Sequence, residues 1–105
     1  MISGLEGVTL KIDRCTEPTF TDPDDEIITS VQSAATEILG KRPALNMRVG
    51  ASDARVYRSA GVPTVVYGPT PYNMGGADEY VMVSELEAIM QVQALAGLRF
   101  LGRKA

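Results

Sequence analysis

The 105-residue sequence contains no histidine, and cysteine occurs once, at Cys15. The absence of histidine excludes a Ser-His or Cys-His nucleophile system and any imidazole metal ligand within this polypeptide. A single cysteine excludes both an internal disulfide and a thiolate cluster for zinc. Any metal bound by this chain alone would have to use carboxylates. We therefore expect no metal ligands and no cofactor in this chain.

The sequence also lacks an excess of positive charge and any long apolar run. Ten Lys and Arg residues stand against 13 Asp and Glu residues, which gives a formal net charge of −3. Such a balance disfavours nucleic acid and anionic membrane surfaces as partners. No apolar run approaches the roughly 20 residues of a membrane span, and the N-terminus does not resemble a signal peptide. We expect a cytoplasmic protein.

The stretch from residue 45 to residue 68 organises the chain. It reads LNMRV, GASDARVYRSAG and VPTVVYG, which predicts a strand, a tight turn, a short helix and a second strand. Gly50 suits the turn, and Ser52 is a candidate N-cap because its hydroxyl can accept a free amide of the first helical turn. Asp53 complements the positive end of the helix dipole, and Gly61 is a candidate C-cap glycine.

The flanking segments extend this alternation of strands and helices. Apolar and polar residues alternate over 8–13, which is typical of a strand. A helix is expected from Asp22 to Gly40. A second long helix is expected over about 85–101, after a capping box that begins at Ser84. This order predicts the fold class α/β, a small layered α/β domain with a narrow, mainly parallel sheet.

Three motifs in this order resemble a known family. They are Gly-x-Ser-Asp-Ala at 50–54, Gly-x-Pro-x-Val-x-x-Gly-Pro at 61–69, and Asp-Glu-Tyr-Val at 78–81 before a helix. The chain is similar, from about residue 8 to residue 101, to the C-terminal segment of the zinc-dependent peptidase and deacylase family. Acetylornithine deacetylase, succinyl-diaminopimelate desuccinylase and the glutamate carboxypeptidases are members of that family.

The resemblance implies a metallopeptidase-like amidohydrolase scaffold. Family members hydrolyse amide bonds of N-acyl amino acids or small peptides with two zinc ions, a bridged water and a glutamate base. Residues 1–21 would match a strand of the lid domain and its connection, and residues 22–105 would match the C-terminal segment of the catalytic domain. Together they would form one partial α/β domain.

The chain departs from the family at the metal site. Where the family places a histidine ligand shortly before the Asp-Glu-Tyr motif, Gly75 stands here. The other ligands and the glutamate base belong to the family's N-terminal half. The resemblance therefore transfers the scaffold, but no catalytic residue and no metal ligand.

The resemblance does supply candidate substrate-binding residues. Gly50, Ala51 and Ser52 match a turn that lines the substrate pocket in the family, and Asp53 continues this motif. Arg55, one turn further on, could meet a substrate carboxylate. Structural roles compete with each of these: Ser52 as an N-cap, Asp53 as a partner of the helix dipole, and Arg55 as a solvated charge.

Three functional hypotheses follow. The chain is a truncated or degenerate hydrolase relative that is inactive alone, or one chain of a split hydrolase whose N-terminal half is a separate chain, or a non-enzymatic binding and assembly module. The last helix is apolar on more than one face, and narrow sheets leave open edges. We therefore expect a homodimer that uses the last helix, a sheet edge or both, and that is sensitive to Glu at Leu95 or Leu98.

Overall fold

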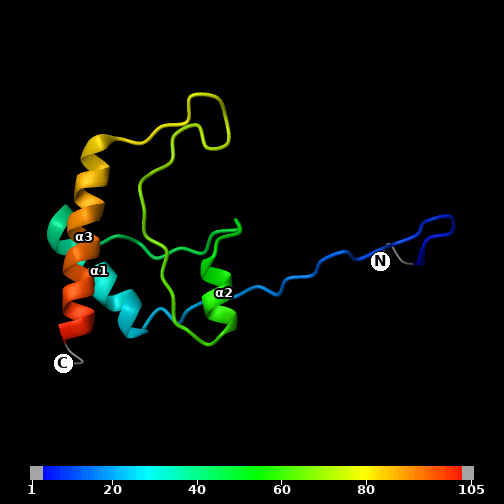
Figure 1. The fold of residues 1–105 in the computed structure, drawn as a ribbon, viewed down its shortest axis with the longest axis horizontal. Helices are drawn as coiled ribbons and strands as arrows, with labels where there is room; N and C mark the ends of the chain where they lie inside the picture. Colours follow the sequence, from blue (N-terminus) through cyan, green and yellow to red (C-terminus); the bar gives the residue numbers. More distant parts are fainter. Residues whose placement is uncertain (1–3, 103–105) are drawn as a thin grey trace.

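Three α-helices form the folded part of the chain. The computed structural model describes residues 4–102, in which α1 spans Glu26–Leu39, α2 spans Ala54–Ser59 and α3 spans Val83–Gly102 (Figure 1). The helices α1 and α3 pack side by side in opposite directions, and among the described helices only these two are in contact. Loops and extended segments make up the rest, and the segment before α1 runs away from the helices as a long arm (Figure 1).

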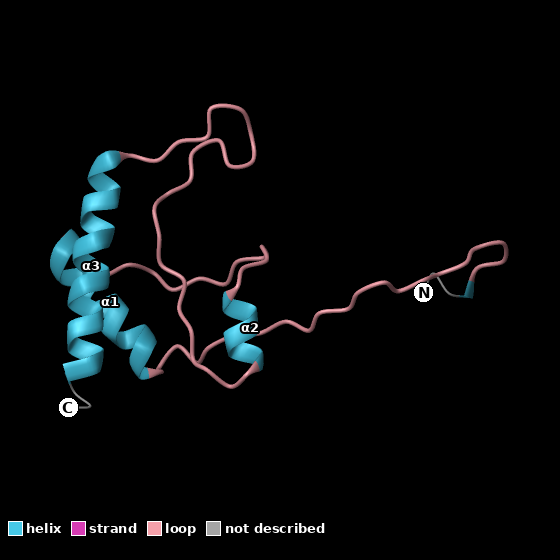
Figure 2. Ribbon diagram, in the orientation of Figure 1, coloured by secondary structure: helices cyan, strands magenta, loops and turns pink. Residues whose placement is uncertain are grey.

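The predicted α/β fold with a narrow parallel sheet is wrong. Within residues 4–102 the structure contains no strand, and its β-type pairing is a single antiparallel bridge between Tyr72 and Tyr80 (Figure 2). The run 45–49, expected as a strand, is exposed throughout, and the run 62–67, expected as a buried strand, is exposed or only half-buried. Alternating and β-rich residues favour extended backbone, but a strand also needs a neighbouring backbone with which to exchange hydrogen bonds. The extended runs of this chain have no such neighbour in the described part.

The helix α1 starts later than the sequence pattern predicted. Asp25 is its N-cap, with the side-chain carboxylate accepting a hydrogen bond from the amide of Ile27 at 2.9 Å. Asp22 instead forms a turn just before the helix, where its carboxylate accepts a hydrogen bond from the amide of Asp24. Gly40 ends the helix in the left-handed conformation, at φ 71°, as the sequence predicted.

The helix α2 ends at the residue predicted from the sequence. The amide of Gly61 donates to the carbonyl of Arg58, and the amide of Val62 donates to the carbonyl of Tyr57. These two bonds define a Schellman motif, and Gly61 has the positive φ of 78° that this motif requires. The chain therefore turns sharply at Gly61 and runs back past α2.

The core lies between α1 and α3 and is built from small side chains. Ala34, Ala35, Val92 and Ala96 are buried. Partly buried apolar side chains surround this group, namely Val31, Ile38, Tyr67 and Leu95. Alanines at the contact let two helix backbones approach closely, and this favours dense packing over a small area.

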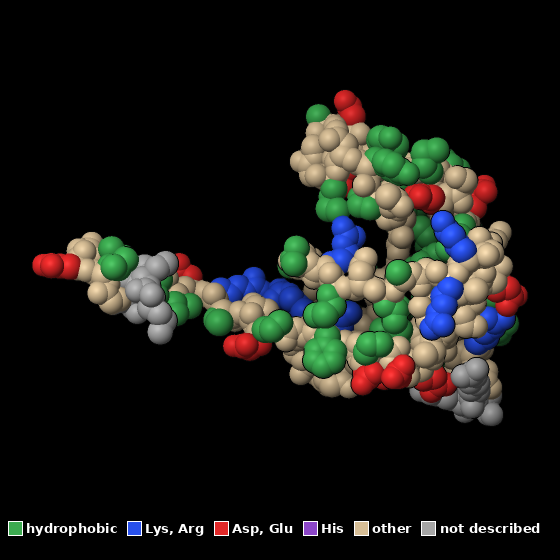
Figure 3. Space-filling model, turned by 180° about the vertical axis from the view of Figure 1, so that it is seen from behind, with side chains coloured by type: hydrophobic (Ala, Val, Ile, Leu, Met, Phe, Trp, Pro, Cys, Tyr) green, Lys and Arg blue, Asp and Glu red, His purple; other side chains and the backbone are tan. Residues whose placement is uncertain are grey.

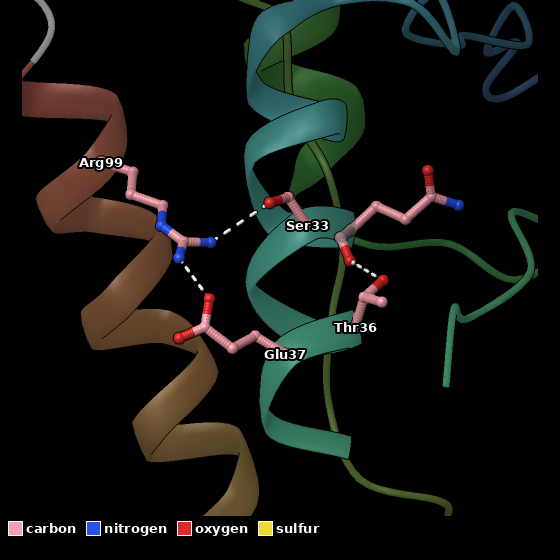
Figure 4. Close-up of polar contacts among 5 residues, drawn as sticks. Ser33, Thr36, Glu37 and Arg99 are labelled. Carbon is pink, nitrogen blue, oxygen red and sulfur yellow. Dashed lines mark hydrogen bonds and ion pairs between the residues drawn. The ribbon is translucent and has the colours of Figure 1, made fainter. Parts of the chain in front are cut away.

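A polar contact fixes the two helices at one edge of this core. Arg99 of α3 donates a hydrogen bond to the hydroxyl of Ser33 at 3.1 Å and forms an ion pair with Glu37 of α1 (Figure 4). The same view shows the Thr36 hydroxyl bonded to the carbonyl of Gln32, within α1. The contact is on the surface, so it sets the register of α1 against α3 more than it adds stability.

The helix α3 is longer than predicted and has no capping box. It begins at Val83, and the carbonyl of Met82 accepts hydrogen bonds from the amides of Glu85 and Leu86. Ser84 therefore lies inside the first turn and does not occupy the N-cap position. The side chain of Glu85 accepts a hydrogen bond from the amide of Thr70 at 3.1 Å, which ties the preceding loop to the start of α3.

The described fold leaves a large surface open to solvent. The chain of 11.3 kDa has a solvent-accessible surface of 8559 Å². A compact protein of this mass exposes about 5,700 Å². Its radius of gyration of 18.5 Å likewise exceeds the value of about 13 Å for a compact chain of this length. Apolar side chains lie open along the arm and where the hairpin meets α3 (Figure 3). Surface of this extent is typical of a chain that packs against further polypeptide.

Candidate functional site

The predicted substrate-binding residues form an exposed turn at the start of α2. Gly50, Ala51, Ser52 and Asp53 are exposed, and Arg55 is half-buried. They lie together along this turn because they are neighbours in the sequence, so their substrate-binding role stays a prediction. No described hydrogen bond uses the side chains of Ser52, Asp53 or Arg55. A hydroxyl, a carboxylate and a guanidinium are therefore open to a ligand within two helical turns.

The predicted role of Ser52 as the N-cap is wrong. Asp53 occupies the N-cap position, at φ −64° and ψ −17°, and its side chain makes no capping hydrogen bond. The backbone carbonyl of Ser52, not its hydroxyl, accepts the amide of Arg55 at 3.2 Å. With six residues, α2 is also too short to present a strong dipole. N-capping by Ser52 and pairing of Asp53 with the helix dipole, the structural roles that competed with substrate binding, are therefore weaker than the sequence suggested.

Arg58 at the end of α2 holds three segments together. Its Nε donates to the hydroxyl of Thr21 and to the carbonyl of Thr64, both at 3.1 Å, and its Nη2 donates to the same carbonyl at 2.8 Å. The Thr21 hydroxyl also donates to the Thr64 carbonyl at 2.7 Å and accepts from the Thr64 amide at 3.0 Å. The planar guanidinium suits such a convergent set of acceptors. This network positions α2, and with it the exposed turn at residues 50–55.

A shallow hollow of about 190 Å³ lies beside this network. Arg58, Asp22 and Asp25 supply its charged side chains, and the rest of its wall is Phe20, Thr21, Gly61, Val62 and Pro63. The hollow is smaller than the roughly 300–1,000 Å³ of typical small-molecule sites. Its polar groups already serve the Arg58 network, the turn at Asp22 and the cap of α1. We therefore assign it a structural role.

A hairpin-shaped loop precedes α3. Tyr72 and Tyr80 exchange two backbone hydrogen bonds of 3.2 Å and stack their rings, with centroids 4.9 Å apart and an interplanar angle of 7°. Between them the side-chain amide of Asn73 bonds the carbonyl of Ala77, and Glu79 accepts from the amide of Gly75 at 3.4 Å. No described hydrogen bond or ion pair joins this hairpin to the exposed turn of α2.

The two adjacent glycines of the hairpin differ in the room around them. A Cβ atom at Gly75 would meet nothing within 4 Å, whereas a Cβ at Gly76 would lie 2.9 Å from Oδ1 of Asn73. Gly75 has a φ of 76°, in the left-handed region that histidine and asparagine enter more readily than most residues. A side chain at position 75 therefore has open space but a strained backbone, whereas one at position 76 requires the Asn73 side chain to shift.

The zinc ions that the resemblance implies do not fit the donor groups of this chain. Residues 4–102 contain no group of three or more His, Cys, Asp or Glu side chains arranged to hold a metal ion. The acidic side chains that lie close in sequence have other partners: Asp22 and Asp25 bond amides near α1, and Glu79 faces the amide of Gly75. Structural and catalytic zinc sites use at least three protein ligands. No step of a reaction can be derived through zinc from these residues.

Comparison with known proteins first identifies the class, a family of peptidases. The chain belongs to peptidase family M20/M25/M40, whose model matches residues 5–98. The resemblance noted from the three sequence motifs is thereby confirmed. No solved structure gives a significant match to the chain.

Three of the matching relatives are enzymes named succinyl-diaminopimelate desuccinylase. The protein of Wolinella succinogenes is 31% identical over 90 residues, which are 84% of this chain and 25% of the relative. That of Hydrogenovibrio crunogenus is 33% identical over 75 residues, 71% of this chain and 20% of the relative. That of Nitratiruptor sp. is 27% identical over 84 residues, 80% of this chain and 23% of the relative. The chain thus spans about a quarter or less of the length of these relatives.

Sequence reasoning missed the residues that support the candidate site. Arg58 lies three residues after Arg55. Its position in the last turn of a short helix was the only sequence feature that pointed to a structural role for this side chain. The contacts to Thr21 and Thr64 span 37 and 6 residues, and no local pattern predicts the longer one. The Tyr72–Tyr80 pair likewise depends on a loop closing, although its Pro- and Gly-rich sequence predicted a loop.

None of the helices in residues 4–102 combines the length and the apolar character needed to cross a membrane.

Proposed function

We propose that this chain acts as the C-terminal part of a catalytic domain in an amidohydrolase of the M20/M25/M40 family, and that it is inert without the segments carrying the zinc ligands. Family membership over residues 5–98 supports the hydrolase class. The observation that carries the proposal is the absence of histidine in a chain that contains the family's motifs at 50–54, 61–69 and 78–81. Zinc and the general base are supplied by further polypeptide, on the same chain or on a separate one.

The role of this segment is to bind and orient the substrate. The relatives named desuccinylases suggest N-acyl amino acids, and N-succinyl amino acids in particular, as the substrate class. Such molecules carry carboxylates at both ends. Arg55 is half-buried and makes no described hydrogen bond, so its guanidinium is free to hold one of these carboxylates in a bidentate pair. The Ser52 hydroxyl and the amides around Gly50 and Ala51 lie next to it along the turn.

A second function is favoured by a different observation. The chain exposes roughly 2,800 Å² more than a compact protein of its mass, much of it apolar. A non-enzymatic binding or assembly module would use such surface for its partners. In this reading the family scaffold is retained and the chemistry is lost. The lone, exposed Cys15 fits the reducing cytoplasm in both readings, and we propose that location.

The proposal predicts that the purified chain binds no zinc tightly and has no amidase activity. We expect elemental analysis after dialysis against zinc to find well below one ion per chain, because zinc sites need at least three protein ligands. We expect no hydrolysis of N-succinyl amino acids in the presence of added zinc. A relative of full length, assayed in parallel, is the positive control.

Stoichiometric zinc together with turnover would refute the proposal. Zinc binding without turnover would contradict the ligand argument alone. A labelled N-succinyl amino acid that binds the chain, with binding lost in Arg55→Gln, would support the substrate role against the assembly reading.

A further inference from the structure

An exposed apolar surface lies where the hairpin meets α3, and we call it the hairpin–α3 face. Figure 3 shows apolar side chains gathered there, with acidic side chains beside them. The face consists of side chains that are 37% to 71% exposed, namely Tyr80, Val81, Met82, Val83, Leu86 and Met90. At 100° per residue, Val83, Leu86 and Met90 lie within an arc of about 60° on α3. The residues of α3 that pack in the core, Val92 and Ala96, lie on the other side of the helix.

The face belongs to a part of the chain that has no basic residue. All Lys and Arg residues lie outside the run 59–98, whereas this run contains the acidic residues Asp78, Glu79, Glu85 and Glu87. None of these carboxylates forms a described ion pair. The dipole of α3 accounts for Glu85 and Glu87, which lie near its N-terminus. It does not account for Asp78 and Glu79 in the hairpin, so the face carries negative charge that helix formation alone does not explain.

Contacts within the chain hold the face in place. Tyr72 and Tyr80 exchange two backbone hydrogen bonds and stack their rings, and Tyr80 remains 53% exposed. Glu85 accepts a hydrogen bond from the amide of Thr70, and the carbonyl of Met82 accepts two amides of the first turn of α3. A surface that is ordered before binding loses little conformational entropy when a partner arrives. The hairpin–α3 face is therefore suited to binding without rearrangement.

We propose that the hairpin–α3 face binds a basic amphipathic helix of another polypeptide. The open side of α3 presents Val83, Leu86 and Met90 at i, i+3 and i+7, the spacing of anchor residues in helix recognition. Met82 and Met90 suit such a contact because the flexible thioether side chain adapts to the shape of its partner. Lys and Arg side chains of the bound helix would pair with the carboxylates around the face, since their long apolar stems can cross the apolar surface while the charged ends stay in water.

The charge of the face selects this partner over others. An acidic peptide or an anionic membrane surface would bring like charges together. A second copy of this chain that used the same face would do so too, because Glu87 lies about 40° around α3 from Val83 and so borders the apolar arc. Charges at the rim of an interface set the choice of partner and the rate of association more than the affinity. The apolar side chains therefore supply the affinity, and the carboxylates supply the specificity.

Three designed peptides of about 18 residues test the sign of the charge. The first is a helix with Leu on one face and Lys on the other, the second has Glu in place of every Lys, and the third has the Leu and Lys residues in shuffled order. We expect fluorescence anisotropy of the labelled Leu/Lys helix to give a Kd of about 1–100 µM. The shuffled peptide should bind at least about 10-fold more weakly, and the Leu/Glu helix should not bind.

Variants of exposed residues test the location of the contact. Glu87→Lys and Met90→Gln should each weaken binding of the Leu/Lys helix about 10-fold. The matched controls are Glu17→Lys in the arm, which changes the net charge by the same amount, and Met47→Gln, at a methionine that is 83% exposed outside α3. Both controls should bind within about 2-fold of the wild type, because neither residue belongs to the face. Circular dichroism checks that each variant keeps its helices.

Absence of binding of the Leu/Lys helix at about 100 µM would overturn the proposal. Equal binding of the Leu/Glu helix would do so too, as would a Glu17→Lys variant that is weakened as much as Glu87→Lys. Sedimentation equilibrium of the chain alone tests for a different occupant, because a dimer that Met90→Gln dissociates would place a second copy on this face and contradict the proposal. None of these measurements involves zinc or substrate, so their outcome is separate from that of the proposed hydrolase role.

Discussion

Val92→Asp should abolish the packing of α1 against α3. Val92 is 1% exposed and is the largest fully buried side chain of the described fold. A carboxylate there would be buried among Ala34, Ala35 and Ala96, whose side chains offer it neither a cation nor a hydrogen-bond donor. The cost of an unpaired buried charge, more than about 4 kcal/mol, is among the largest effects of single substitutions. We expect loss of most helical signal in far-UV circular dichroism and no cooperative thermal transition.

The neighbouring residue gives the control. Gln93 is exposed and lies about 100° around the helix from Val92, so Gln93→Asp adds the same charge outside the core. It should keep the wild-type spectrum and change stability by less than about 0.5 kcal/mol. Equal loss of structure in both variants would show that α3 is not anchored through Val92, and would contradict the described core.

Arg58→Met should release the segments that Arg58 joins. The substitution keeps an apolar stem of similar reach but removes the guanidinium that bonds Thr21 and Thr64. Hydrogen bonds from a charged group are worth about 1.5–3 kcal/mol each when buried. Because this network is only partly buried, we expect a total loss of about 2 kcal/mol in the free energy of unfolding. Urea denaturation measures this loss as a shift of the midpoint, provided that the m-value of the variant equals that of the wild type.

Arg55 supplies a matched control on the same helix. It carries the same charge but makes no described hydrogen bond, so Arg55→Met should leave the urea midpoint nearly unchanged. Thr21→Val removes the shared hydroxyl without touching a charge and should reproduce about half of the Arg58 effect. Indistinguishable midpoints for Arg58→Met and Arg55→Met would contradict the assigned network.

The parts of the fold that could be predicted from sequence are those set by local chemistry. The two long helices follow from their apolar periodicity, and the ends of α1 at Gly40 and of α2 at Gly61 follow from glycine's tolerance of positive φ. The helix starts were less accurate. Several acidic residues before α1 could each have served as the N-cap, and in the structure Asp25 occupies that position.

The sheet could not be predicted correctly from the sequence, because a strand is defined by its neighbour. The segments at 8–13 and 45–49 have the composition of strands, but no second strand lies beside them in the described residues. The local sequence pattern indicates the conformation that a segment favours, but not whether a second strand lies beside it. For the same reason the sequence did not predict the contact between Arg58 and Thr21, two residues that lie 37 positions apart.

Some features of the candidate site could likewise be predicted from the sequence, and others only from the structure. The motif at 50–54 and the family it indicates were accessible from residue identity and spacing, and the match over residues 5–98 confirms the family. The freedom of the Ser52 hydroxyl and the different surroundings of Gly75 and Gly76 depend on three-dimensional geometry. The resemblance already placed the missing histidine at Gly75, and the structure adds how the surroundings of the two glycines differ.

One measurement tests most directly the central proposal, a family scaffold that lacks its metal ligand. Residues 5–98 would replace the matching segment in the desuccinylase of Wolinella succinogenes, in versions carrying Gly75, Gly75→His and Gly76→His. A Cβ at position 75 meets nothing within 4 Å on a backbone whose φ of 76° strains any side chain, whereas a Cβ at position 76 lies 2.9 Å from the Asn73 side chain, which would have to shift. We expect folded chimeras in all three cases and desuccinylase activity in Gly75→His alone, more than about 100-fold above the other two. Full activity with Gly75 unchanged, or a folded Gly75→His chimera no more active than Gly76→His, would contradict the account.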